Sequence, residues 1–513
     1  MLAKTALLIV SNPNHLGRIL LNIHEKVKTT LYIQLLSGIS GPFSFYPNVF
    51  TSWPKYSQII WGIYSQAARH CQNLDVRVLL SALKYNNVSK IHTQNAIDLV
   101  IFDREYTKAD IDVFLDAKIG NVAADCDVLT IKGNGSDVVA AIEPHNNKIY
   151  THTVAGGTFD RLHIAHKLLL SEVALRSSSR VTVGVTDENM LQSKTLYELV
   201  EPLENRLNGV KDFMMDVCPE LNYTIVPIRD LYGPTQHDPT MELIVVSAET
   251  IKGGHKINEI RQSKNLPILE ILEVELIQEP YPESMEELKI SSSTARMRLL
   301  GTLLNPPRKN TLIPNKPYVI GLTGGIASGK SSISLRLKEL GAEIIDCDQV
   351  GHEMYKPGKR CYDLIVETFG KTILSENGEV NRKALGAVVF KSPEELQKLN
   401  NLVWPAIAEE VVNRIKTSSA EVLVVEAAVL LKASWEKYCH EIWTTIIPRA
   451  EAIQRLQSRN GLTQEQAQQR IASQCSNEVY TRSANVVFCS LWEREYTISQ
   501  VNKAWDLLQK RLL

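Results

Sequence analysis

The sequence predicts an α/β protein made of three consecutive segments. Short apolar runs alternate with polar, helix-like stretches along the 513 residues, and this alternation is typical of strands followed by helices. A chain of this length exceeds one hydrophobic core, so several domains are expected. A glycine-rich stretch at 324–331 stands between an apolar run and a helix-forming stretch, where α/β proteins bind phosphate groups.

Composition narrows the class of protein. The formal net charge is -1, with 44% apolar and 22% charged residues, which gives no general attraction to nucleic acid. No apolar run approaches the roughly 18 residues that a membrane-spanning helix needs. The eight cysteines form no C-x-x-C pair, so free thiols in a reducing compartment are expected. We therefore expect a cytoplasmic monomer with no transmembrane segment and no nucleic-acid partner.

The first segment, residues 1–148, is predicted to be an α/β domain without a catalytic pattern. Apolar runs at 5–10, 30–35, 76–80 and 97–102 are its expected strands. Its first 30 residues carry several cations beside one acid, Glu25. An ordinary first strand and helix explains this pattern, and we favour it; a mitochondrial address is the alternative. Contact with a protein partner or the mitochondrial surface is a further role that this segment leaves open.

The second segment, 149–304, is predicted to be another α/β domain. Its strands are expected around 151–154, 181–185, 223–228 and 243–247. Residues 305–317 follow with four prolines. Proline continues neither a helix nor a central strand, so this stretch is the predicted linker, and its length allows many domain orientations.

The third segment, 318–513, begins with a strand and the loop GGIASGKS, which satisfies G-x-x-x-x-G-K-[ST]. Backbone N–H groups of such a loop surround phosphate oxygens, Lys330 reaches the β- and γ-phosphates, and Ser331 can bind Mg²⁺. The predicted ATP-binding residues are those of the loop and the start of the helix: Gly324, Gly325, Ile326, Ala327, Ser328, Gly329, Lys330, Ser331 and Ser332.

Two further groups of residues are candidates in this segment. Asp346 and Asp348 end the next apolar run, so a carboxylate here can accept a proton from a sugar hydroxyl; capping the following helix is the alternative. Arg455, Arg459 and Arg470 lie in a helical, polar stretch. Their guanidinium groups can close over ATP phosphates, although a solvated helix face would also be rich in arginine.

These motifs resemble the dephospho-coenzyme A kinase family. The resemblance rests on GLTGGIASGKS, the D-x-D of IIDCDQV, KPG at 356–358 and R-I-A-S-Q at 470–474, and it covers about 318–500. It implies that Asp348 is the base for the ribose 3′-hydroxyl, and that Asp346 orients substrate or metal. Arg470 would contact the substrate. Trp404-Pro405 and Ala484-Asn485 depart from the family's usual His-Pro and Ala-Asp.

The second segment carries GGTFDRLHIAHKLLL at 156–170. His163 and His166 are three residues apart, so both project from one side of the first helical turn, where they can donate to a phosphoryl group. Histidines with a purely structural role are the alternative. No further His/Cys cluster supports zinc.

This motif resembles nucleotidyltransferases with a T/H-x-G-H signature, with Ala165 in place of the glycine. Together with YGPTQHDP at 232–239 and KISSSTAR at 289–296, it resembles the phosphopantetheine adenylyltransferase domain of animal-type coenzyme A synthases. The resemblance implies that Thr158 and Lys194 position the substrate phosphate, and that His163 and His166 stabilise the transition state. It implies ATP contacts from Gly156, Gly157, Thr158, Phe159, Ser291, Ser292, Ser293 and Arg296.

The two resemblances imply one function. Adenylyl transfer to 4′-phosphopantetheine makes dephospho-coenzyme A (dephospho-CoA), which the kinase would phosphorylate with ATP and Mg²⁺. A transferase–kinase fusion acting on other small molecules is one alternative. A scaffold that binds nucleotide as a switch is the other.

Overall fold

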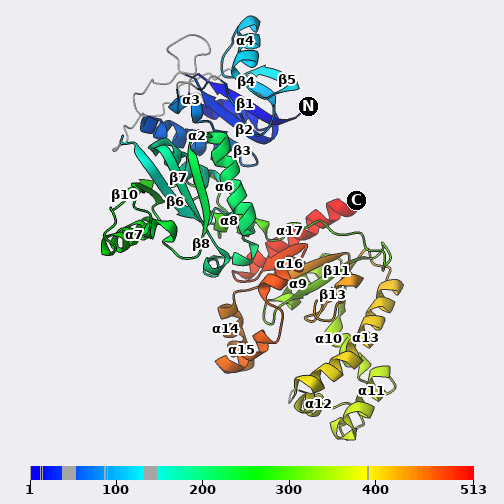
Figure 1. The fold of residues 1–513 in the computed structure, drawn as a ribbon. Helices are drawn as coiled ribbons and strands as arrows, with labels where there is room; N and C mark the ends of the chain where they lie inside the picture. Colours follow the sequence, from blue (N-terminus) through cyan, green and yellow to red (C-terminus); the bar gives the residue numbers. More distant parts are fainter. Residues whose placement is uncertain are drawn as a thin grey trace. The chain divides into compact units, whose positions relative to one another are not determined.

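The α/β prediction is confirmed by the computed structural model, which describes residues 2–11, 13, 16–36, 53–85, 88, 90–131, 147–389 and 392–513. The chain forms two compact units, Met1–Ala295 and Arg296–Leu513. The first unit contains two five-stranded sheets and the second unit contains one (Figure 1). Parts of the predicted first segment and two residues of the third lie outside the described residues.

The N-terminal sheet has the strand order β3-β2-β1-β4-β5, and its strands are parallel. The strands are β1 (Ala3–Val10), β2 (Val27–Leu35), β3 (Asp75–Val78), β4 (Ile97–Phe102) and β5 (Val122–Thr130). The helices are α1 (Leu16–Ile23), α2 (Ser57–His70), α3 (Ser81–Lys84) and α4 (Lys108–Lys118). Residues 5–10 of β1 are all buried, as expected for a central parallel strand covered on both faces. The first 30 residues thus include an ordinary strand and helix.

The second sheet has the order β10-β9-β6-β7-β8 and is also parallel. Its strands are β6 (Tyr150–Gly157), β7 (Ser177–Thr186), β8 (Asn222–Ile228), β9 (Leu243–Ser247) and β10 (Glu270–Val274). Helices α5 (Ile164–Arg176), α6 (Leu203–Val217), α7 (Ile251–Ser263) and α8 (Ser292–Leu299) follow them. Numbered along the chain, the strands of both sheets have the order 3-2-1-4-5.

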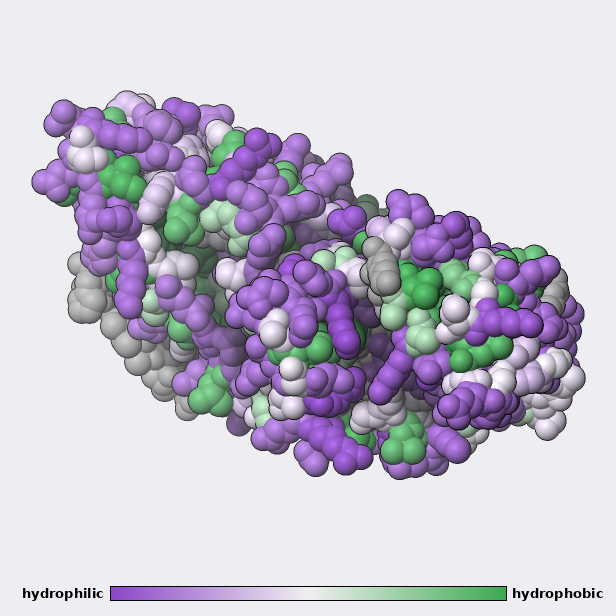
Figure 2. Space-filling view, turned by 90° about the horizontal axis from the view of Figure 1, so that it is seen from below, coloured by the Kyte–Doolittle hydropathy of each residue, from purple (hydrophilic) through white to green (hydrophobic). Residues whose placement is uncertain are grey.

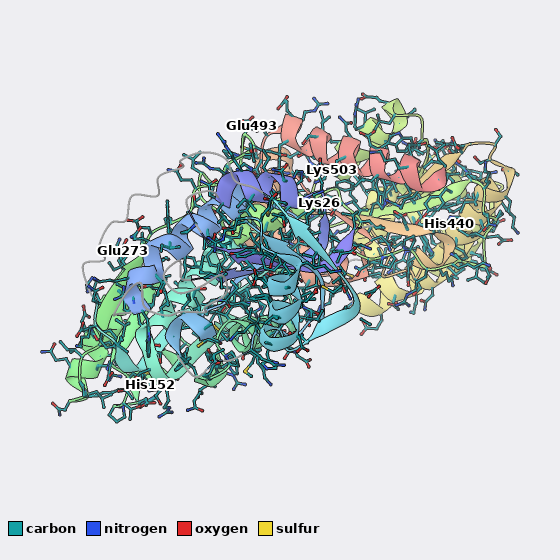
Figure 3. The ribbon with its side chains drawn as sticks, turned by 90° about the horizontal axis from the view of Figure 1, so that it is seen from above. Lys26, His152, Glu273, His440, Glu493 and Lys503 are labelled. Carbon is teal, nitrogen blue, oxygen red and sulfur yellow. The ribbon has the colours of Figure 1, made fainter. Side chains whose placement is uncertain are left out.

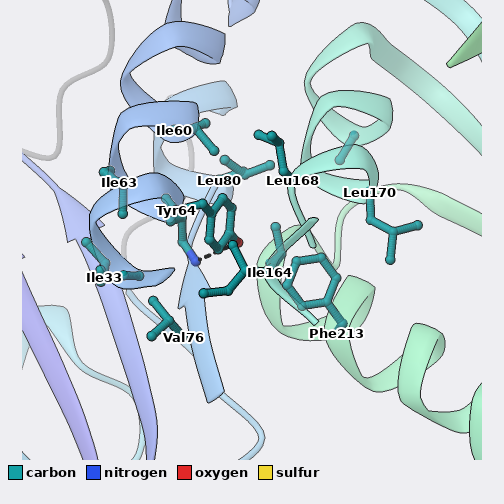
Figure 4. Packing of buried hydrophobic residues seen from close by; sticks show 14 of the residues in the cluster. Ile33, Ile60, Ile63, Tyr64, Val76, Leu80, Ile164, Leu168, Leu170 and Phe213 are labelled. Atoms are coloured by element: carbon teal, nitrogen blue, oxygen red, sulfur yellow. Dashed lines mark hydrogen bonds between the residues drawn. The ribbon is translucent and has the colours of Figure 1, made fainter. Parts of the chain in front are cut away.

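The two sheets of the first unit share one hydrophobic core. Figure 4 shows Ile60 and Tyr64 of α2 beside Leu168 of α5 and Phe213 of α6. The predicted first and second segments are therefore packed into one unit rather than separated by solvent.

The third sheet has the order β12-β13-β11-β14-β15 and is parallel. Its strands are β11 (Tyr318–Gly324), β12 (Glu343–Asp346), β13 (Val422–Glu426), β14 (Glu441–Ile446) and β15 (Val486–Cys489). The first helices are α9 (Lys330–Glu339), α10 (Cys347–Met354), α11 (Arg360–Phe369), α12 (Arg382–Val389) and α13 (Pro393–Thr417). The remaining helices are α14 (Arg449–Asn460), α15 (Gln464–Ala472), α16 (Asn477–Ser483) and α17 (Arg494–Leu512).

The proline-rich connecting segment is irregular, as its prolines predict, but it is attached to the second unit. Leu304 N donates to Asn485 O at 2.7 Å. Asn485 Nδ2 donates to Asn305 O, and Asn305 Nδ2 donates to Ala484 O, both at 3.0 Å. Ile313 is 7% exposed and belongs to the core of this unit. These contacts leave the segment much less freedom than an unattached linker.

The surface is mainly polar in the face that Figure 2 shows, where hydrophobic residues form small separate groups. Among the described residues, no helix combines the length and apolar character needed to cross a membrane.

Candidate active sites

The kinase-type loop connects the end of β11 to the start of α9. Gly324 has φ 142°, and a Cβ at this position would lie 2.2 Å from Thr445 O. Gly329 has φ 91° directly before the helix. Only glycine tolerates both the backbone conformation and the contact at 324. The predicted loop residues Gly324–Gly329 therefore form a tight turn, and Lys330, Ser331 and Ser332 open the helix.

Lys330 lies across this loop. Its Nζ donates to Gly324 O at 2.7 Å and to Gly325 O at 2.9 Å. Burial lowers the pKa of Lys330 to about 8, although the charges of Glu426 and Asp348 act in the opposite direction. A buried ammonium beside a glycine turn is suited to receiving phosphate charge.

Glu426 is a candidate that the sequence analysis missed. It ends β13, whose neighbour in the sheet is β11. Ser331 Oγ donates to Glu426 Oε1 at 3.3 Å. A hydroxyl and a carboxylate are oxygen ligands of the type that Mg²⁺ uses. The available signal was the acid ending the apolar run VLVV, but only the strand order shows that it meets the loop.

The two aspartates after β12 have different surroundings. Asp346 Oδ1 accepts hydrogen bonds from Asp348 N at 2.9 Å and from Gln349 N at 3.1 Å, so its side chain caps α10. Asp348 lies in the first turn of α10 with its side chain exposed. Its charge raises the pKa of Lys330, and it follows the carboxyl end of β12, the end of the parallel sheet at which the loop after β11 also lies. Asp348 is therefore the better placed candidate base.

The three arginines are not equivalent. Arg455 Nη1 donates to Ala327 O at 3.2 Å and to Ser490 Oγ at 2.9 Å, so it holds the loop backbone. Arg459 is exposed on the same helix, and its charge lowers the pKa of Lys330. Arg470 is exposed on α15. Arg459 is thus an exposed arginine of α14 that remains available to a nucleotide near the loop.

Three polar side chains outside the motif support the loop. Thr445 Oγ1 and Ser490 Oγ donate to Ser328 O at 2.7 and 2.8 Å. Ile326 N donates to Gln474 Oε1 at 2.6 Å. Thr445 and Ser490 carried no signal in the sequence because Thr445 lies in β14 and Ser490 directly follows β15, both far from the loop along the chain.

The residues that depart from the usual kinase pattern, Trp404-Pro405 and Asn485, make defined contacts in the structure. Trp404 and Pro405 lie inside α13 and line a cavity of about 720 Å³ together with Trp435. Asn485 uses Oδ1 to accept from Ile442 N at 2.7 Å, and Nδ2 to bind the connecting segment. An aspartate at 485 would lack the Nδ2 donor to Asn305 O.

The transferase-type site lies where β6 ends and α5 begins. The rings of His163 and His166 stack with centroids 3.7 Å apart and planes 16° apart. Phe159 is buried with φ 50°, and its ring lies 5.2 Å from that of His166. Gly156 and Gly157 end β6, and Thr158 follows them before this pair.

The two histidines differ from His152, a histidine of β6 labelled in Figure 3. His152 is buried, and both of its ring nitrogens lie 2.9 Å from threonine hydroxyls. The Nδ1 atom of His166 is buried and has no hydrogen-bond partner. Burial lowers the pKa of His166 to about 4, while Asp160 opposes the shift and Lys167 adds to it. His166 is therefore a neutral donor near pH 7.

Ser292 joins the second predicted loop to these histidines. Its Oγ donates to Asp160 O at 3.0 Å and lies 3.3 Å from His163 Nε2. The hydroxyl proton is used by Asp160 O, so Nε2–H of His163 is the donor in the second contact. Residues 156–166 and Ser292 thus meet at one place.

Asp160 and Arg206 hold this site and were not predicted. Arg206 is 1% exposed, and its Nη1 donates to Thr158 O at 3.0 Å and to Thr186 O at 2.7 Å. Asp160 is fully buried and accepts from Glu201 N at 2.9 Å. Arg206 lies in an ordinary amphipathic helix, so its role had no local signal.

The remaining predicted residues lie at the edges of the site. Lys194 is exposed, and its charge adds to burial in lowering the pKa of Lys289. Ser291 Oγ accepts from Thr294 N at 3.2 Å at the start of α8, and Ser293 is half-buried there. Arg296 is buried and is the first residue of the second unit.

The folds and sites define a nucleotidyltransferase-like domain followed by a P-loop kinase. Residues 154–298 match the cytidylyltransferase-like family, and residues 318–490 match the dephospho-CoA kinase family. The chain belongs to the dephospho-CoA kinase family, and it carries a cytidylyltransferase-like domain in addition.

The matched kinase segment covers nearly the full length of each of these relatives. The chain is 38% identical to dephospho-CoA kinase of Carboxydothermus hydrogenoformans over 186 residues, which are 36% of this chain and 90% of the relative. It is 36% identical to the Geobacillus kaustophilus kinase over 37% of this chain and 98% of the relative. It is 37% identical to the Enterococcus faecalis kinase over 36% of this chain and 94% of the relative.

Proposed function

We propose that the chain catalyses the two consecutive last steps of coenzyme A synthesis. In the first, ATP and 4′-phosphopantetheine give dephospho-CoA and diphosphate. In the second, ATP and dephospho-CoA give coenzyme A and ADP. The observation that carries the proposal is the joining of a nucleotidyltransferase-like site to a member of the dephospho-CoA kinase family, because adenylyl transfer to phosphopantetheine makes that kinase's substrate.

The first reaction requires positioning and charge stabilisation rather than a general base. An oxygen of the ionised 4′-phosphate forms a bond to the α-phosphorus of ATP, and the bond to the departing diphosphate breaks. Neutral His166 donates to a phosphoryl oxygen at the start of α5, where the helix dipole also favours negative charge. The Nε2–H of His163 exchanges its contact with Ser292 Oγ for a second phosphoryl oxygen. Lys194 and Thr158 position the attacking phosphate, and Ser291–Ser293 bind the leaving diphosphate.

The second reaction is a phosphoryl transfer at the glycine loop. The 3′-hydroxyl oxygen bonds to the γ-phosphorus as the bond to ADP breaks, and Asp348 accepts the hydroxyl proton. Lys330 and Arg459 offset charge on the transferred group. Arg455 and Gln474 keep the loop in place through Ala327 O and Ile326 N.

The kinase site fits a magnesium ion carried by ATP. Ser331 and Glu426 would hold the ion, because their hydroxyl and carboxylate oxygens already lie together at the loop. When bound, Mg²⁺ neutralises phosphate charge.

A product assay tests the proposal. Wild-type protein is incubated with 4′-phosphopantetheine, ATP and Mg²⁺, and products are separated by chromatography. Lys330→Ala should accumulate dephospho-CoA without coenzyme A. His166→Ala should slow the first step on the order of 10²–10³-fold while added dephospho-CoA is still phosphorylated.

The alternatives give other results. If wild type phosphorylates dephospho-CoA but never forms it from phosphopantetheine, the first domain acts on another substrate. Nucleotide binding without turnover of any pantetheine derivative would favour a scaffold.

A further inference from the structure

Helix α5, which carries the candidate histidines, is anchored at its first turn by the N-terminal sheet. Lys167 N donates to His163 O at 3.1 Å, the hydrogen bond that closes this turn. The side chain of Lys167 is 4% exposed, and its Nζ lies 2.5 Å from Asp75 Oδ1 at the start of β3. One residue therefore joins the histidine turn to a strand 92 positions earlier in the chain.

The anchor continues into a chain of partly buried charges. Arg77 of β3 contacts Asp75 Oδ2 at 2.7 Å and Asp216 Oδ2 of α6 at 2.5 Å. Tyr32 Oη of β2 donates to Asp216 Oδ2 at 2.8 Å. Two cations balance two carboxylates, so the network has no net charge. Burial alone would raise the pKa of Asp75, but Lys167 and Arg77 outweigh it and the pKa is lowered.

The rest of α5 is also held by residues of the N-terminal segment, from helices α2 and α3. Ser57 Oγ of α2 donates to Glu172 Oε1 at 2.9 Å. Lys84 Nζ of α3 donates to Ala174 O at 2.5 Å and to Ser177 O at 2.7 Å, so a cation caps the carboxyl end of the helix. Ten of the thirteen α5 residues are buried. The histidine helix is thus fixed at its start, middle and end by the N-terminal part of the unit.

The N-terminal sheet is itself poorly suited to phosphate. It has the strand order of the transferase-type sheet, but Asp103 follows β4 at the sheet edge, where it accepts from Ser11 N at 2.6 Å and from Ser11 Oγ at 2.9 Å. A carboxylate here disfavours an anion. In sequence, H-L-G-R at 15–18 spans the start of α1, as H-I-A-H at 163–166 spans the start of α5; His15 lies outside the described residues.

We propose that the N-terminal sheet is a non-catalytic counterpart of the transferase-type sheet that positions α5, and that Asp75 is its positioning residue for His166. The proposal rests on the proposed adenylyl transfer. The carboxylate of Asp75 fixes Lys167, Lys167 fixes the turn, and the turn sets where the two imidazole rings meet the phosphoryl group. A displacement of about 1 Å can cost on the order of 100-fold in rate.

The test uses full-length Asp75→Asn, Lys167→Met and their combination, with Asp103→Asn as the matched control in the same sheet. Asp75→Asn should lower kcat for adenylyl transfer at least tenfold, leave KM within about threefold, and leave phosphorylation of added dephospho-CoA unchanged. The double variant removes both charges, so its Tm should return toward wild type while kcat stays low. Recovery of kcat together with Tm would show that the pair only stabilises the fold and would overturn the proposal. So would an equal loss in Asp103→Asn.

Hydrogen exchange provides a measurement that needs no substrate. The amide of Lys167 should exchange at least tenfold faster in Asp75→Asn and in the double variant, while amides in the centre of α6 should keep their protection. Unchanged exchange at Lys167 would overturn the positioning role. If wild type makes no dephospho-CoA from phosphopantetheine, the proposed function fails, and the exchange result still decides whether Asp75 fixes the turn.

Discussion

Nucleotide binding at the kinase loop should be coupled to proton uptake by Lys330. Burial lowers the pKa of this lysine to about 8 before phosphate arrives. The β- and γ-phosphates would favour the charged ammonium and return the pKa to its ordinary range or above. At pH 9 roughly nine in ten Lys330 side chains are then neutral before binding, and at pH 7 roughly one in ten.

The size of the effect follows from these fractions. If only the ammonium form binds well, affinity should fall about tenfold between pH 7 and pH 9. Nearly one proton should be taken up per nucleotide at pH 9, and roughly one tenth of a proton at pH 7. The folded protein binds fewer protons than the unfolded chain between about pH 8 and 10.5, so this group makes stability rise with pH across that window.

Calorimetric titration with a non-hydrolysable ATP analogue, in two buffers of different ionisation enthalpy, measures the uptake. Lys330→Met is the control, since it keeps the second nucleotide site and should lose the pH-dependent component. The reasoning fails if wild-type affinity at the kinase loop is constant from pH 7 to pH 9 and no proton is absorbed at pH 9.

Three further results are expected. Glu426→Gln should lower kinase kcat on the order of 100-fold and leave adenylyl transfer intact, measured with added dephospho-CoA; an unaltered Mg²⁺ dependence would argue against its role. The ring of His166 should titrate only near pH 4 by NMR, because burial disfavours its cation; titration near pH 6.5 would contradict the neutral donor. Asn485→Asp should lower the free energy of unfolding of the second unit by about 1–3 kcal/mol in denaturant unfolding, because it loses the donor to Asn305 O. If the variant is as stable as wild type, that hydrogen bond does not contribute to stability.

The parts of the sites that the sequence predicted are those encoded locally. The turn at Gly324 and the helix beginning at Lys330 depend on neighbouring residues, so spacing alone reveals them. The same holds for His163 and His166, whose separation of three residues brings the rings together on one turn.

The parts that it did not predict depend on strand order. Glu426 reaches Ser331 only because β13 lies beside β11, and Asp75 reaches Lys167 only because the two sheets of the first unit share a core. The residue pattern alone did not separate Asp346 from Asp348, which only the family resemblance distinguished; in the structure the cap hydrogen bonds distinguish them. β5 was not predicted because VAADCDVLT interrupts its apolar residues with polar ones at an edge of the sheet.

The contact between β15 and the residues directly before the connecting segment bears on aggregation. β15 is the last strand of its sheet, and Leu303 forms an antiparallel bridge with Val486 there. An open strand edge is a template for pairing with other chains. A kinase fragment trimmed to begin at residue 318 would present that edge to solvent together with the pocket vacated by Ile313. Residues 301–304, directly before the proline-rich stretch, therefore cover this strand edge and keep neighbouring molecules from adding to the sheet.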